Sequence, residues 1–149
     1  MSISDISSGL LTRRATASGM GVPFVDKHQR MVEEFMTAFG QHVPGTWNTV
    51  TFPAELRLKL IREEVDELTD AIEKKDWIEV VDAICDLLYV TYGAASALGV
   101  DIEPFFAEVH RSNMAKLGDD GKPIRREDGK VLKPLTWTPP DLMSVLRRE

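Results

Sequence analysis

The chain of 149 residues contains little cysteine, little histidine and fewer basic than acidic residues. The single cysteine, Cys85, excludes an internal disulfide framework and a cysteine-based zinc site, and it fits a reducing compartment. Eighteen Lys and Arg stand against 24 Asp and Glu, so the composition gives little support to nucleic-acid binding. The longest uncharged apolar run, residues 87–100, is shorter than the ~20 residues that a membrane span needs. We therefore expect a cytoplasmic protein that binds neither nucleic acid nor a membrane.

Apolar residues at helical spacing predict two helices in the first half of the chain. The first begins after the N-cap residue Asp26 and ends before Gly40, and its apolar positions are Met31, Phe35 and Phe39. The second spans roughly residues 54–75. Its apolar stripe consists of Leu58, Ile61, Val65, Leu68 and Ile72. We expect both apolar faces to be buried.

Two further helices are predicted after residue 75. The third begins at Asp76, ends at Gly99 and is apolar on nearly every side, so we expect it to be buried centrally. The fourth begins after Asp101 and runs to about Leu117, with polar residues as well as apolar ones on its inner face.

The ends of the chain differ in composition from the helical part. Residues 1–23 are rich in Ser, Thr and Gly without the apolar stretch of a signal peptide, which predicts a flexible leader. From residue 118 onward, turn residues and short apolar segments predict an irregular tail that contains a small hairpin. Residues 24–149 are therefore expected to form one all-α domain, a four- to five-helix bundle with a C-terminal tail. Because the apolar third helix cannot be covered by one copy, we expect a homodimer or a dimer of dimers.

Acidic residues are concentrated in the second and third helices, where residues 55–86 hold eleven acids and five bases. Glu64 and Glu67 lie within an apolar strip of the second helix, and Asp82 and Asp86 share one arc of the third. A buried carboxylate must be protonated, paired with a base or neutralised by a cation. Carboxylate oxygens without cysteine are hard ligands, which favours Mg²⁺, with Mn²⁺ also possible.

The spacing of these acids indicates two opposed pairs of ligands. Glu64 and Glu67 are three residues apart and Asp82 and Asp86 are four apart, so each helix presents a pair on one face. A di-iron carboxylate bundle needs Glu-x-x-His on two helices, and no histidine of this chain follows a Glu at that spacing. The pattern therefore favours a magnesium site between the two helices.

Two separated acidic motifs resemble those of the all-α nucleoside triphosphate pyrophosphohydrolases. They are Glu63-Glu64-Val65-Asp66-Glu67 and an acidic pair that opens Asp86-Leu87-Leu88-Tyr89. That superfamily includes MazG-like proteins, dimeric dUTPases and phosphoribosyl-ATP pyrophosphohydrolase, and residues 87–116 look particularly like MazG-like proteins with dUTPase-type activity. The resemblance implies Mg²⁺-dependent hydrolysis of a nucleoside triphosphate to the monophosphate and pyrophosphate, with dUTP or a noncanonical dNTP as the expected substrate.

The resemblance also implies roles for individual acids. Glu64, Glu67 and Asp86 correspond to metal ligands, and Glu63 to a further ligand or to the catalytic group that orients the attacking water. The family's second motif is Glu-x-x-Asp, whereas the residue three before Asp86 is an alanine. We expect Asp82 to replace the family's glutamate as the fourth ligand. Two residues on the same arc are expected in the outer shell, namely Glu79 and Tyr89.

Substrate contacts are expected from basic, polar and aromatic side chains. The candidates for phosphate or sugar are Asn113, Lys116, Lys130 and Lys133, and those for stacking on the base are Phe35 and Phe39. Two alternatives stay open. The same reaction on phosphoribosyl-ATP is one, and a non-enzymatic dimeric helical module that binds a nucleotide or a partner is the other.

Overall fold

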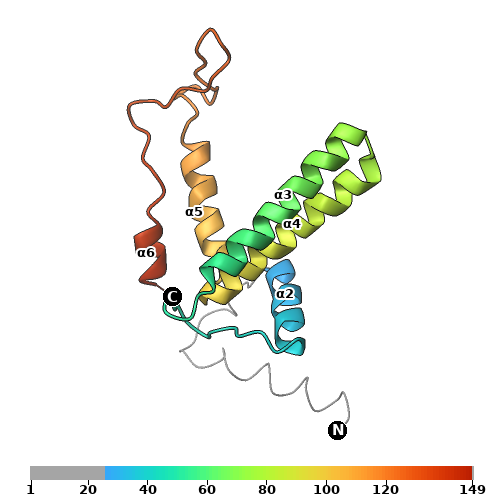
Figure 1. Cartoon of the computed structure of the whole chain (residues 1–149). Coiled ribbons are helices and arrows are strands. Elements are labelled where there is room, and N and C mark those ends of the chain that lie inside the picture. The colour runs from blue at the N-terminus through green and yellow to red at the C-terminus, as the bar shows by residue number, and fades with distance from the viewer. Residues whose placement is uncertain (1–25, 149) are drawn as a thin grey trace. The chain divides into compact units, whose positions relative to one another are not determined.

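The computed structural model describes residues 26–148, so the predicted leader lies outside the described residues. Within this range the fold is all-α, as predicted, and no strand is present. The chain divides into two compact units, Met1–Asp101 and Ile102–Glu149. No single helix in the described part is long and apolar enough to cross a membrane. The helices, labelled as in Figure 1, are α2 (Lys27–Ala38), α3 (Ala54–Lys74), α4 (Trp77–Leu98), α5 (Ile102–Met114) and α6 (Leu142–Leu146).

The predicted helix boundaries are confirmed by the capping interactions. The Asp26 carboxylate accepts hydrogen bonds from the main-chain N–H groups of His28 and Gln29 at the start of α2. Asp76 caps α4 in the same way, and α4 ends at Gly99 in the left-handed conformation (φ 78°). Short polar side chains and glycine therefore set the ends of these helices.

The buried face of α2 differs from the predicted one. Gln29, Val32 and Met36 are buried, whereas the predicted stripe of Met31, Phe35 and Phe39 is exposed. A glutamine can occupy the core because its amide donates to the Val100 carbonyl oxygen (2.7 Å) and to the Ser96 hydroxyl (3.2 Å). These two acceptors lie at the C-terminal end of α4, so the buried amide joins α2 to α4.

The expected burial of α3 and α4 is also wrong in part. On α3 the buried residues are Arg57 and Ala71. The predicted stripe is half-exposed at Leu58, Val65 and Ile72. On α4 most buried residues lie near the C-terminal end, from Gly93 to Ala97, whereas Trp77, Ile78, Val81, Ile84 and Leu88 are exposed. Within the described residues, α4 is thus not buried along its whole length.

The unit Ile102–Glu149 contains α5, α6 and the irregular segment between them (Figure 1). Glu108 joins these parts, because its carboxylate pairs with Arg111 (2.8 Å) and accepts from the Asp141 main-chain N–H (2.8 Å). The hydrogen bonds from Arg111 hold the pKa of Glu108 at about 2. The predicted hairpin is present as an antiparallel bridge between Arg125 and Val131.

Replacement of Gly99 by alanine is expected to destabilise the unit that contains α4. The residue adopts a positive φ, and a Cβ there would overlap the carbonyl oxygen of Thr46. The strain and the overlap together should cost about 2–4 kcal/mol of unfolding free energy. Urea denaturation measures the loss. Gly45→Ala is the matched control, because a Cβ at Gly45 would meet no atom within 4 Å. Equal stability of the two variants would contradict this account of the α4 terminus.

Candidate active site

The candidate site lies between α3 and α4, which run antiparallel and pack along their length (Figure 1). One point of contact is the Arg57 guanidinium, which lies so close to Gly93 that a Cβ there would be 2.9 Å from Nη1. Seven residues along each helix from this contact are Glu64 and Asp86. Seven residues are two helical turns, or about 10.5 Å, so Glu64 and Asp86 are brought to the same level.

The second point of contact is electrostatic. Burial raises the pKa of Glu64, and the negative charges of Glu67, Asp86, Glu63 and Asp82 raise it further. Two of these carboxylates belong to α3 and two to α4, so the predicted pairs face each other across the helix interface. Glu64 is partly buried, whereas Glu67, Asp82 and Asp86 are exposed. The charges of Glu67, Asp82 and Asp86 thus act on Glu64, and the role of these four residues as metal ligands stays a prediction.

The donor set fits a hard divalent cation, since every candidate ligand is a carboxylate oxygen. Among the described residues, however, no three Asp, Glu, His or Cys side chains converge closely enough to form a ligand group. The side chains face one another without meeting at one point. Coordination of one ion would therefore require rotation of the exposed side chains.

The remaining predicted acids flank this group. The Glu63 carboxylate lies 3.5 Å from the Lys59 ammonium in an exposed pair on α3. Glu79 lies in the first turn of α4, where its main-chain N–H donates to Asp76. Asp82 is one of the carboxylates that raise the pKa of Glu64, as expected for a side chain that faces α3. The choice of Asp82 as the fourth candidate ligand stays a prediction.

Three aromatic rings form a cluster where α2 meets α4. The rings of Phe35 and Phe39 stack with centroids 4.3 Å apart, and Tyr89 meets Phe35 edge-on at 5.7 Å. Tyr89 lies one helical turn from Asp86 on the same face of α4. Phe39 is 70% exposed. Among the described residues, no hydrogen bond joins the Tyr89 hydroxyl to a site carboxylate, so the outer-shell role of Tyr89 stays a prediction.

The other predicted substrate contacts lie in the unit Ile102–Glu149. The Lys116 ammonium donates to the Asn113 side chain (2.7 Å), and Asn113 is exposed rather than on a buried inner face. Lys130 is exposed in the hairpin, and the Lys133 ammonium lies 3.8 Å from the centre of the Trp137 ring. Their roles toward substrate stay predictions.

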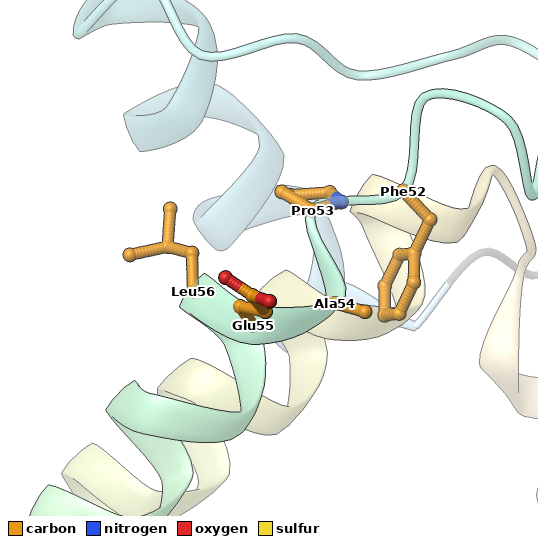
Figure 2. A pocket seen from close by; sticks show the side chains of 5 residues that line it. All are labelled: Phe52, Pro53, Ala54, Glu55 and Leu56. Carbon is orange, nitrogen blue, oxygen red and sulfur yellow. The ribbon is translucent and has the colours of Figure 1, made fainter.

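A shallow pocket opens at the start of α3 (Figure 2). It is lined by Phe52, Pro53, Ala54, Glu55 and Leu56, and it contains none of the predicted site residues. Its one charged group is the exposed carboxylate of Glu55. The pocket therefore adds no group to the acidic site.

Two residues of this region, Arg57 and Gln41, were not predicted from the sequence. Arg57 is the one base on the inner strip of α3, and Gln41 accepts a hydrogen bond from its guanidinium (3.2 Å). The spacing of seven residues between Arg57 and Glu64 places both on one face, and this signal could have identified Arg57. Nothing in the sequence marks Gln41.

An all-α fold with opposed carboxylate pairs on two adjacent helices is the class expected of nucleotide pyrophosphohydrolases. Residues 32–113, more than half of the chain, match the model of the phosphoribosyl-ATP pyrophosphohydrolase family. The chain belongs to this family, which is part of the all-α MazG-like superfamily of enzymes that hydrolyse phosphoric anhydrides. The match includes α3, α4 and their acids, and it confirms the resemblance drawn from the two motifs.

A curated relative occurs in Acanthamoeba polyphaga mimivirus, where it is described as an uncharacterised protein. It is 36% identical over 77 residues, which are 48% of this chain and 31% of the relative. The chain thus spans less than a third of the length of the curated relative that it matches.

Replacement of Glu64 by glutamine is expected to stabilise the protein in the presence of a chelator. The raised pKa means that the Glu64 charge is less favourable in the folded chain than in the unfolded one, so folding stability falls as pH rises through this range. A neutral glutamine removes the repulsion and should add roughly a few tenths of a kcal/mol at pH 7. Thermal unfolding measures the change.

Asp70→Asn is the control for this experiment, because Asp70 is exposed and pairs with Lys74 (3.7 Å) instead of facing α4. It should leave the unfolding midpoint unchanged or slightly lower it. If Glu64→Gln has a lower thermal unfolding midpoint than the unmodified protein in chelator, the carboxylates do not repel one another in the folded chain.

Proposed function

We propose that the chain hydrolyses a nucleoside triphosphate to the monophosphate and pyrophosphate in a Mg²⁺-dependent reaction. The observation that supports this most directly is the group of four carboxylates around Glu64. Acids that face one another across a helix interface need a counter-charge, and a triphosphate needs one as well. A divalent cation held between them satisfies both, so an acidic protein can bind an anionic substrate.

The proposed ligands are Glu64, Glu67, Asp82 and Asp86. When bound, Mg²⁺ supplies charge neutralisation of the phosphates and a lower pKa for water in its shell. Glu63 is exposed beside Glu64, where its carboxylate can orient a water molecule and accept its proton. The bond between the α- and β-phosphates then breaks, and pyrophosphate is the leaving group.

For the substrate we favour dUTP or a noncanonical dNTP, on the resemblance of residues 87–116 to MazG-like proteins with dUTPase-type activity. The exposed rings of Phe35 and Phe39 support a free nucleotide, because they offer a surface for a base next to the acids. Phosphoribosyl-ATP is the second candidate, and the family match supports it equally. A non-enzymatic module that binds a nucleotide or a partner is the third.

We also propose that the chain forms a homodimer or a dimer of dimers through α3 and α4. The exposed residues Trp77, Val81, Ile84 and Leu88 form one stripe of α4, at spacings of four, three and four. This stripe lies on the far side of α4 from Asp82 and Asp86. A second copy that covers it would leave the acids open to substrate.

Pyrophosphate release from a panel of dNTPs, NTPs and phosphoribosyl-ATP, each with Mg²⁺, Mn²⁺ or chelator, tests the proposed reaction. Release should require the divalent cation. Glu64→Gln and Asp86→Asn should each lower it roughly a hundredfold or more, which corresponds to the loss of about 2.7 kcal/mol of transition-state stabilisation.

The control variant is Asp70→Asn, whose side chain does not face α4 and which should release pyrophosphate at the unmodified rate. Release from phosphoribosyl-ATP alone would assign the second substrate. Absence of release from every compound would contradict an enzymatic role and leave the binding module.

A charge in the apolar stripe of α4 is expected to weaken self-association. Leu88→Arg places a cation on the proposed interface and should raise the dissociation constant of the dimer by at least about tenfold. Sedimentation equilibrium measures it. Asp66→Arg, on the side of α3 opposite Arg57, should have no such effect. A monomer at all concentrations of the unmodified chain would contradict the proposed dimer.

A further inference from the structure

Arg57 is a buried cation whose hydrogen-bond partners are all neutral. The residue is 7% exposed, and its Nε–H has no acceptor. One Nη donates to the Gln41 side-chain oxygen (3.2 Å) and lies 3.9 Å from the Met36 sulfur. Burial lowers the pKa of the guanidinium, but an arginine remains charged in proteins. Gln41 is thus the main polar partner of this charge among the described residues.

This contact fixes the orientation of the Gln41 amide. A guanidinium only donates hydrogen bonds, so it must be bound by the amide oxygen and not by the amide nitrogen. The NH₂ group is therefore directed away from Arg57, and Gln41 is exposed. In contrast to a free glutamine, which can rotate and accept, Gln41 presents a hydrogen-bond donor at the surface.

Arg57 of α3 packs against Gly93, which lies on the same face of α4 as the acids. Asp82, Asp86, Tyr89 and Gly93 follow one another at spacings of four, three and four residues, so they share one face. The guanidinium packs on Gly93, two turns or about 10.5 Å from Asp86 along the axis. Tyr89 lies between these levels, with Phe35 against its ring. From the acids toward Gln41, the order is proposed cation-binding group, aromatic surface and hydrogen-bond donor.

We propose that Gln41, held by Arg57, determines base specificity by donating to a carbonyl oxygen on the edge of the nucleobase. This inference rests on the proposed function, which places the phosphates at the acids. The order of groups matches that of a nucleotide, whose base lies at the end opposite to its terminal phosphates. A donor at this position favours a keto group, such as O4 of uracil, and disfavours an amino group, such as N4 of cytosine.

The pair dUTP and dCTP tests the proposal, because these two nucleotides differ only in the group at C4, keto or amino, and in the proton on the adjacent N3. The unmodified protein should prefer dUTP by about tenfold in kcat/KM, the effect of one hydrogen bond to a partly exposed group. Gln41→Met, which keeps the shape and removes the donor, should abolish the preference. Gln41→Glu should reverse it, because one carboxylate oxygen pairs with Arg57 and the other accepts from the amino group of cytosine.

His42→Ala, at the exposed neighbouring position, is the matched control and should keep the preference for dUTP. Two results would overturn the role of Gln41 while the proposed hydrolysis stands. One is metal-dependent release with equal kcat/KM for dUTP and dCTP. The other is a dUTP-to-dCTP ratio of kcat/KM that neither Gln41→Met nor Gln41→Glu changes. No metal-dependent release from either nucleotide would overturn both. Retention of the α-helical circular dichroism signal by each variant separates a change of specificity from unfolding.

Discussion

The antiparallel register of α3 and α4 is the constraint on which the account of this molecule depends. The Arg57 guanidinium packs on Gly93, and the same register brings the charge of Asp86 close enough to raise the pKa of Glu64. Both pairs fit one antiparallel alignment of the helices. Arg57 lies level with Gly93, and seven residues along each helix from that contact Glu64 lies level with Asp86. A shift by one turn would separate Glu64 from Asp86 and place a larger side chain against the Arg57 guanidinium in place of Gly93.

This register separates two kinds of group along the α3–α4 pair. At one level the acids require a counter-charge. Two turns away, the buried Arg57 has only neutral hydrogen-bond partners. The polar groups of the α2 side also serve the fold, because Gln29 joins α2 to the end of α4 through Val100 and Ser96. Helix α2 therefore does more than cover apolar surface. It carries Phe35, whose ring contacts Tyr89 of α4, and Gln41 follows three residues after its last residue, Ala38.

The sequence predicts the helices well and their buried faces poorly. Asp26, Asp76 and Gly99 mark helix ends because caps and glycine act locally, within a few residues. Burial is decided by packing between helices, so the apolar stripes of α2 and α3 are exposed where Gln29 and Arg57 take the interior positions. The opposed acids were predictable from spacing alone, since carboxylates three and four residues apart share a helix face. The contact between Arg57 and Gln41 joins residues 16 apart through a loop, and no periodic pattern encodes it.

Direct measurement of Mn²⁺ binding tests the central proposal, that the carboxylates of α3 and α4 bind a divalent cation. Titration calorimetry on the unmodified chain, Asp86→Asn and Asp70→Asn separates the inner acids from the outer ones. We expect binding that Asp70→Asn preserves and Asp86→Asn weakens by at least about tenfold, because Asp86, unlike Asp70, lies close enough to act on Glu64. Equal affinities for all three proteins, or no heat of binding to the unmodified chain, would contradict it.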